Sequence, residues 1–211
     1  MATFPFTNDP TSQVELIYIA YFGRAGDPKG VNFWVNELTA VGDTVIPGMT
    51  GVAAAFSLQP EAMAQYPLLA NPQGASQTDI QVFINAIYQN LFDRSADQKG
   101  LAFWTNEVNT IFATGDPLTI ANGIGQMAVS IAVGAQGTDQ TVLANKVTAS
   151  DFLTEIFGKD GINTFPNPSA EFTFSHTDIA SIDSSQASVS AAETAAIGFV
   201  TSLTPDNIHF I

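Results

Sequence analysis

The 211-residue chain contains no cysteine. This absence excludes disulfide bonds, thiolate metal sites and cysteine nucleophiles, and it fits either a cytosolic protein or a cysteine-free secreted one. No run of 18 apolar residues occurs, so the sequence predicts no transmembrane helix. Residues 1–13 have neither a basic stretch nor an apolar segment, and we expect no Sec-type signal peptide there.

Charge is also scarce, and basic charge most of all. Only 12% of the residues are charged, about half the usual share of roughly 25%, and six basic residues against 20 acidic ones give a net charge of −14. Binding to nucleic acid requires cations that displace counterions from phosphates, so this balance argues against it. No cofactor is evident; calcium is the ion that would suit such an acidic surface outside a cell.

The surface must therefore be covered largely by uncharged polar residues. Two explanations are open: a simple compositional bias, or a secreted bacterial surface protein, in which low-lysine sequences rich in Ala, Thr, Asn and Gly are common. Apolar residues make up 45% of the chain and include 16 phenylalanines. The sequence therefore predicts a packed globule.

One stretch of the sequence occurs twice. Residues 14–38 and 84–108 align without a gap, and both tryptophans of the protein lie in the match. An internal repeat indicates the architecture before any local prediction. The paired positions are Tyr18 and Tyr88, Phe22 and Phe92, Arg24 and Arg94, Asp27 and Asp97, Lys29 and Lys99, Gly30 and Gly100, Phe33 and Phe103, and Trp34 and Trp104.

Each copy is predicted to form two helices joined by a short loop. Apolar residues in the first arm of each copy recur at the spacing of one helix face. An aspartate followed by proline, at Asp9 and again at Asp27, predicts a helix start, and residues 78–81 have the spacing of a capping box with Thr78 as its first residue. Beyond the repeats, we expect a helix over residues 139–157, an irregular segment over 158–174 and a final helix over 189–203.

These elements predict an all-α protein: two tandem helical-hairpin repeat units with a C-terminal helical extension. The predicted domains are residues 1–74, 75–137 and 138–211. Because a single hairpin cannot bury both of its faces, the units are expected to pack on each other and on the extension.

Four of the six basic residues, Arg24, Lys29, Arg94 and Lys99, lie in the two loops of the repeat. They have two interpretations. In the structural one, each arginine bonds carbonyls at the end of the first helix and pairs with an acidic neighbour. In the functional one, the four residues bind a sugar hydroxyl or an anionic group of a glycan. The acidic neighbours are Asp27 or Glu37 in the first copy and Asp97 or Glu107 in the second.

The aromatic and glycine positions of the repeat have a structural interpretation. Trp34 and Trp104 each follow a phenylalanine on an apolar helix and are expected in the core, although an exposed tryptophan would stack on a sugar. Gly30 and Gly100 lie inside the second helix of each copy, where glycine costs about 1 kcal/mol relative to alanine. They therefore predict a close approach of the facing helix.

Catalytic motifs are lacking. The two histidines show no metal-ligand spacing, no Gly-x-Ser-x-Gly elbow occurs, and there is no phosphate-binding loop with lysine. We therefore expect a non-enzymatic protein.

The repeated pattern Tyr-x3-Phe-x-Arg-x2-Asp-x2-Gly-x2-Phe-Trp-x2-Glu resembles the bacterial family called domain of unknown function 4214. Tyr18 to Glu37 carry it once and Tyr88 to Glu107 carry it again, and the resemblance extends over roughly residues 10–160. Such domains occur in S-layer proteins and in calcium-binding repeat proteins exported by type I secretion. The family offers no catalytic residues to transfer.

The resemblance implies a secreted, cell-surface module for anchoring or adhesion, which binds a bacterial surface polysaccharide such as lipopolysaccharide. The alternative is a self-association module whose acidic faces are bridged by calcium into a lattice.

Overall fold

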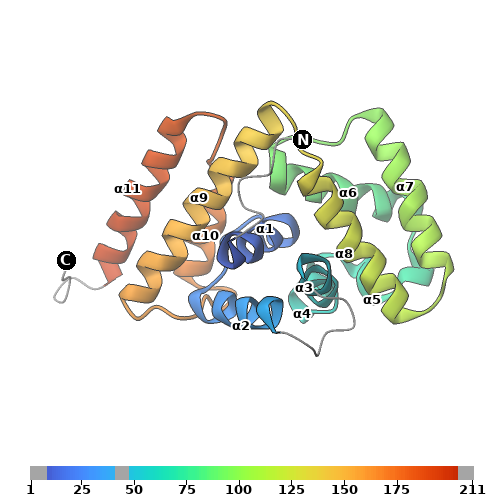
Figure 1. Ribbon diagram of the computed structural model, residues 1–211, viewed down its shortest axis with the longest axis horizontal. Helices are drawn as coiled ribbons and strands as arrows, with labels where there is room; N and C mark the ends of the chain where they lie inside the picture. The colour runs from blue at the N-terminus through green and yellow to red at the C-terminus, as the bar shows by residue number, and fades with distance from the viewer. Residues whose placement is uncertain (1–8, 41–47, 204–211) are drawn as a thin grey trace.

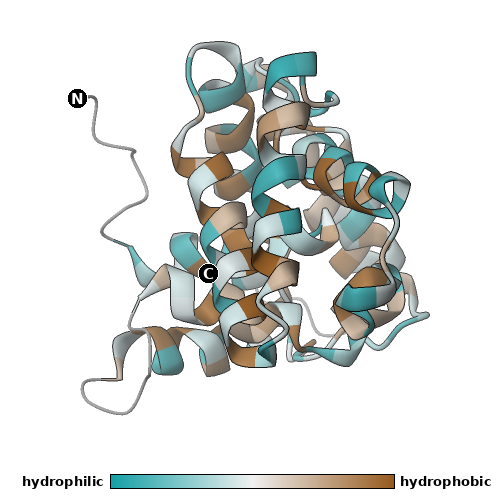
Figure 2. Ribbon diagram, turned by 90° about the vertical axis from the view of Figure 1, so that its right-hand side faces the viewer, coloured by the Kyte–Doolittle hydropathy of each residue, from teal (hydrophilic) through white to brown (hydrophobic). Residues whose placement is uncertain are grey.

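The computed structural model describes residues 9–40 and 48–203, and this part of the chain is all-α, as predicted. No strand occurs in these two ranges. The helices are α1 (Pro10–Phe22), α2 (Pro28–Thr39), α3 (Met49–Ser57), α4 (Pro60–Gln65), α5 (Pro67–Ala70), the 3-10 turn η1 (Pro72–Gly74), α6 (Gln77–Phe92), α7 (Gln98–Ala113), α8 (Pro117–Val133), α9 (Thr138–Lys159), α10 (Ala170–Ala180) and α11 (Gln186–Leu203). Figure 2 shows hydrophobic and hydrophilic residues alternating along most of them, as one-sided burial requires.

Helix α1 lies in the middle of the molecule (Figure 1) and packs against α2, α3, α6, α8 and α9. Every residue from Val14 to Phe22 is buried. The prediction of a single apolar face is therefore wrong for α1, because Leu16 and Ile19 on its other side also face protein. In α6 the one-sided pattern holds, since Phe83 and Ile84 are fully buried while Val82 is exposed.

The helix starts follow from local chemistry. Asp9 accepts a hydrogen bond from the Thr11 N–H, and Asp27 caps α2 by accepting from the Gly30 N–H at 2.9 Å. The capping box of α6 begins earlier than predicted, because Ser76, and not Thr78, is its N-cap residue.

Helices α1 and α6, the first helices of the two repeats, end in the same way. Gly23 after α1 and Asp93 after α6 both adopt the left-handed conformation that stops a helix.

The C-terminal part is more helical than predicted. Helix α10 begins at Ala170, within the segment expected to be irregular, because Ser169 caps it by accepting a hydrogen bond from the Phe172 N–H. Helix α9 packs on α1 as well as on α10 and α11. Whether residues 1–74, 75–137 and 138–211 act as separate domains stays a prediction.

Helices α3 and α8 pack against each other with their backbones close together. A Cβ atom added to Gly125 of α8 would lie 2.4 Å from the backbone nitrogen of Ala54 in α3. The backbones can meet at this distance only if position 125 has no side chain. Gly125 therefore holds the two helices together through close backbone packing.

We expect Gly125→Ala to lower the free energy of unfolding by about 1–3 kcal/mol, because the new methyl group overpacks this contact. Gly198→Ala on α11 is the matched control, since its Cβ would meet nothing within 4 Å. That substitution should stabilise the protein slightly through helix propensity. Urea unfolding of both variants measures the difference, and equal effects would contradict the close-packing interpretation.

Candidate functional site

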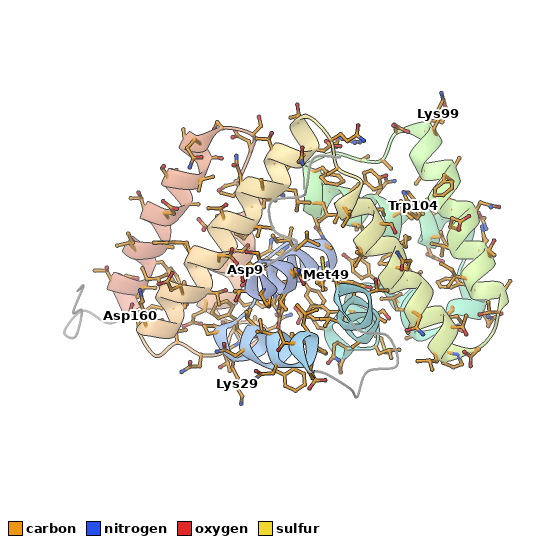
Figure 3. The ribbon with its side chains drawn as sticks, viewed as in Figure 1. Asp9, Lys29, Met49, Lys99, Trp104 and Asp160 are labelled. Carbon is orange, nitrogen blue, oxygen red and sulfur yellow. The ribbon has the colours of Figure 1, made fainter. Side chains whose placement is uncertain are left out.

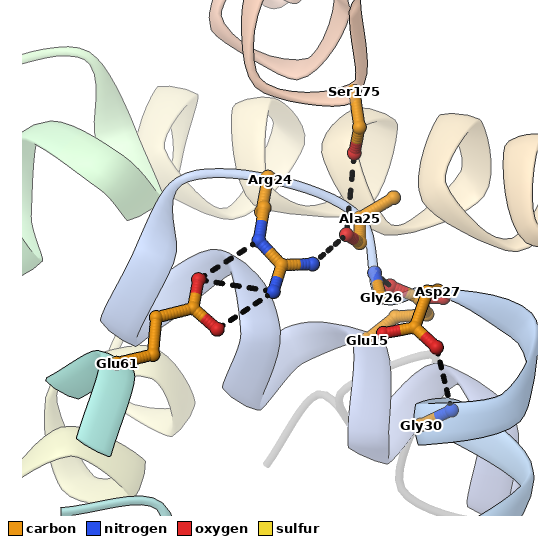
Figure 4. Close-up of polar contacts among 8 residues, drawn as sticks. All are labelled: Glu15, Arg24, Ala25, Gly26, Asp27, Gly30, Glu61 and Ser175. Carbon is orange, nitrogen blue, oxygen red and sulfur yellow. Dashed lines mark hydrogen bonds and ion pairs between the residues drawn. The ribbon is translucent and has the colours of Figure 1, made fainter. Parts of the chain in front are cut away.

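Arg24 links the loop between α1 and α2 to the start of α4. Its side chain is buried, and Nε and Nη2 donate to the Glu61 carboxylate at 2.9–3.2 Å while Nη1 donates to the Ala25 carbonyl at 2.9 Å (Figure 4). The Ser175 hydroxyl of α10 donates to the same carbonyl. The guanidinium also lies 5.2 Å from the centre of the Phe172 ring. Arg24 thus joins segments that are distant in sequence.

Arg94 makes the same pattern of contacts in the second copy. Nε and Nη2 donate to Asp139, in the first turn of α9, and Nη1 donates to the Ser95 carbonyl at 2.9 Å. This pair is more open than the first, because the Arg94 side chain is 43% exposed. Bonding to Asp139 raises the pKa of Arg94, so its charge is secure.

The predicted ion-pair partners were wrong in both copies. Asp27 and Asp97 instead cap α2 and α7, by accepting hydrogen bonds from the backbone N–H three residues on. The arginines reach past their own hairpins to acidic residues in the first turns of the later helices α4 and α9, where negative charge is favourable. Sequence spacing could not reveal these partners, because Glu61 and Asp139 lie outside the matched stretch.

A buried carboxyl group also supports the first loop. Glu15 is fully buried, and its Oε2 accepts a hydrogen bond from the Gly26 N–H at 2.8 Å. In the second copy the neutral Asn85 accepts the corresponding bond from the Ala96 N–H. Burial raises the pKa of Glu15 to about 8.

Hydrogen-bond geometry also favours a neutral Glu15. The Thr154 hydroxyl of α9 lies within bonding distance of both the Gly26 carbonyl and the Glu15 carboxyl group. A hydroxyl has one proton to donate. If that proton goes to the carbonyl, Glu15 must be protonated and donate to Thr154. The proton on Glu15 then completes a ring of hydrogen bonds that joins α1, the loop and α9.

A second carboxyl group at the α1–α9 contact, that of Asp151, also has a raised pKa. Asp151 accepts a hydrogen bond from the Ser12 hydroxyl at 2.7 Å, and burial raises its pKa to about 6. Its Oδ1 is buried and has no partner within the described ranges. Sequence reasoning missed Glu15 and Asp151, because a lone acidic residue on a helix is usually exposed.

A buried lysine joins α9 to the end of α6. Lys146 is 1% exposed, and its Nζ donates to Asp93 at 2.6 Å and to the Asn90 carbonyl at 2.8 Å. Burial lowers the pKa of Lys146, and the bond to Asp93 opposes that effect. Sequence reasoning missed this residue as well, because its partners belong to another helix.

The four basic residues predicted to bind a ligand do not form one patch. Arg24 is 3% exposed and fully engaged in the structure, so it does not offer its donors to a ligand. Lys29 and Lys99 are exposed in the first turns of α2 and α7. Figure 3 shows them reaching out from opposite edges of the molecule.

The aromatic pairs divide between core and surface. Trp34 and Trp104 are partly buried against the core, whereas Phe33 is 54% exposed and Phe103 is 56% exposed. Each phenylalanine meets its tryptophan edge to face, at centroid distances of 4.9 and 4.8 Å. Neighbouring residues on a helix point about 100° apart, so a helix that packs on one side only buries one ring of such a pair more than the other. The tryptophans, which were expected in the core, are packed against it but only partly buried.

Within the described ranges, no three histidine, aspartate or glutamate side chains gather closely enough to hold a metal ion.

The Arg24 bridge should matter more for stability than the Arg94 bridge. We expect Arg24→Ala to lower the free energy of unfolding by about 1–3 kcal/mol, since it leaves Glu61 without its donors. Arg94→Ala, at a more exposed pair, should cost less than about 1 kcal/mol. Denaturant unfolding measures both values, and a larger loss for Arg94→Ala would contradict this ranking.

Glu15 should make stability depend on pH. Its folded pKa lies above the unfolded value of 4.5, so the native state holds a proton that the unfolded state has lost. The stabilisation is complete below about pH 4.5 and is lost as pH rises to about 8, with a slope of at most about 1.4 kcal/mol per unit. Glu15→Gln keeps both hydrogen bonds without the titration.

Unfolding free energies between pH 5 and 8 test this expectation. The slope should decrease in Glu15→Gln and persist in Glu155→Gln, an exposed control on α9. Equal slopes in wild type and Glu15→Gln would show that Glu15 is not the titrating group.

Comparisons with known proteins show similarity to one family model and to part of one larger protein. Residues 67–113 match the model of the family described as domain of unknown function (DUF4214). The chain is 28% identical over 194 residues to an S-layer protein of Synechocystis sp., across 90% of this chain but only 10% of that protein. The chain therefore spans about a tenth of that relative's length. No solved structure matches.

The described helices add one negative finding. None is by itself long and apolar enough to cross a membrane, and α8 and α9 pass that test only as a pair bent by 108°.

The match to the family model covers the second copy of the motif and not the first. The resemblance predicted from the sequence is thus confirmed: residues 67–113 carry the DUF4214 pattern, and the chain is similar to a segment of a bacterial S-layer protein.

Proposed function

We propose that this chain is a non-catalytic module that anchors a secreted bacterial surface protein by binding a surface glycan such as lipopolysaccharide. The similarity to a segment of an S-layer protein supports a role at the cell surface. The observation that carries glycan binding is an aromatic ring left exposed in each hairpin, at Phe33 and Phe103. A lysine lies one helical turn before each ring.

This arrangement suits a sugar polymer. An exposed ring offers a flat apolar face to the C–H groups of a pyranose, and a lysine at i−4 lies on the same side of the helix. That lysine can donate hydrogen bonds to hydroxyl groups or to an acidic group of the glycan. Because Lys29 and Lys99 point from opposite edges, the module presents two separate contacts (Figure 3). A flexible polysaccharide that reaches both edges lets the two weak contacts reinforce each other by raising the local concentration.

Retention of the protein on cells tests the proposal. Wild-type protein should bind cells that carry the outer polysaccharide and be lost from cells that lack it. The double variant Phe33→Ser/Phe103→Ser should reduce retention at least tenfold. The matched control is Leu118→Ser, which removes a different hydrophobic residue that is 52% exposed.

The salt dependence of retention identifies the chemistry. Binding to neutral sugars should change little with salt, whereas an acidic glycan should be released by salt and by Lys29→Gln/Lys99→Gln. Equal retention on both cell types would exclude glycan anchoring.

The alternative is self-association into a calcium-bridged lattice, favoured by the net charge of −14. A cation that bridges acidic faces of two copies would offset their repulsion. In that case the protein should be retained equally on both cell types. It should also elute as larger particles from size-exclusion chromatography in millimolar calcium, and a chelator should disperse these particles.

A further inference from the structure

A small cavity lies beside Arg24, between the first hairpin and the start of α4. Its volume is about 150 Å³. Its lining includes Tyr18, Asp27, Trp34, Gln59 and Glu61 along with Arg24. Tyr18 is 5% exposed, so its ring is held firmly in the core while it contributes to the cavity wall. The cavity is of a size for one small polar molecule.

The corresponding tyrosine and tryptophan of the second copy satisfy each other. There the Trp104 indole N–H donates to the Tyr88 hydroxyl at 3.2 Å. In the first copy no such bond joins Tyr18 and Trp34 within residues 9–40 and 48–203, and both residues line the cavity instead. Neither the Tyr18 hydroxyl nor the Trp34 indole nitrogen is among the fully buried atoms that lack a partner in these ranges.

A difference in packing accompanies this opening. A Cβ on Gly30 would lie 2.3 Å from the Tyr18 hydroxyl oxygen, against 3.3 Å for Gly100 and Tyr88. The Tyr18 hydroxyl therefore lies closer to the α2 backbone than its counterpart does to α7. Two polar groups that could have paired with each other are instead free to bind a third partner at the cavity.

The charges around the cavity select the kind of partner. Glu61 is neutralised by Arg24, and Asp27 uses one oxygen to accept from the Gly30 N–H at 2.9 Å, which leaves its other oxygen as an acceptor. One guanidinium faces two carboxylates, so the lining is negative and disfavours an anion. The tyrosine hydroxyl both donates and accepts, the indole donates, and the carboxylate accepts. Sugar hydroxyl groups can bond all three.

We propose that the cavity beside Arg24 binds one neutral sugar residue, held by Tyr18, Trp34 and Asp27. This inference rests on the proposed glycan binding and assigns it a specific pocket in the first hairpin. The exposed Phe33 lies next to Trp34 on the same helix, α2. A polymer with one sugar in the cavity can therefore extend across the Phe33 ring. The second hairpin, in which the tyrosine and tryptophan are bonded together, would contribute surface contact alone.

Tryptophan fluorescence tests the pocket directly, because the chain has only two tryptophans. In the Trp104→Phe background the emission reports on Trp34 alone. The probes are free glucose, galactose, mannose and N-acetylglucosamine at millimolar concentrations. We expect a saturable change in emission with at least one of them. Adding Tyr18→Phe should raise the dissociation constant at least tenfold, whereas the matched Tyr88→Phe should leave it unchanged.

Melting temperatures establish that each variant is folded. If Tyr18→Phe fails to fold, Trp34→Phe removes the indole donor while it keeps a ring, and isothermal calorimetry with the same sugars replaces fluorescence. The same tenfold weakening is then expected. Unchanged affinity in a folded site variant would overturn the proposal.

The outcomes separate this proposal from anchoring itself. If no sugar perturbs Trp34 and Tyr18→Phe is retained on cells like wild type, the cavity holds water only and the pocket is wrong, while glycan anchoring stands. If sugars bind at Trp34 but retention is equal on cells with and without polysaccharide, the pocket stands and anchoring is excluded.

Discussion

The burial of α1 on every side is the constraint on which the rest of the structure depends. Polar groups on its buried stretch, Val14 to Phe22, are removed from bulk water, and most of them find partners inside the protein. The Tyr21 hydroxyl donates to the Ala53 carbonyl at 2.9 Å, and the Tyr66 hydroxyl donates to the Tyr21 carbonyl at 2.8 Å. Glu15 meets the same requirement through Gly26 and Thr154, with a proton retained near neutral pH. These bonds position α3, α5 and α9 around the central helix.

The two loop arginines extend this organisation outward. Each guanidinium bonds the carbonyl of the next residue and a carboxylate in the first turn of a later helix. The geometry is shared, but Arg24 is buried and Arg94 is 43% exposed. The two copies of the motif therefore contribute unequally to stability, because solvent weakens the ion pair of Arg94. A similar asymmetry distinguishes the two tyrosine–tryptophan pairs: Tyr88 and Trp104 are bonded to each other, whereas Tyr18 and Trp34 line a cavity.

Sequence reasoning succeeded where interactions are local. The all-α class, the starts at Asp9 and Asp27 and the one-sided burial of α6 follow from spacing and capping. It failed where two distant segments meet. The pairing of Arg24 with Glu61, the burial of Lys146 and the exposure of Phe33 depend on which helix lies opposite, and no local pattern encodes that.

The sequence by itself determined that this protein is helical, acidic, free of cysteine and similar to DUF4214, because composition, periodicity and motif spacing are properties of the chain. Only the tertiary structure decided which arginine is buried, which carboxyl group keeps its proton and which tyrosine lines a cavity. Burial sets the first two, since removal from water changes the free energy of a charged group far more than its neighbours along the chain do, and the packing of helices distant in sequence sets the third.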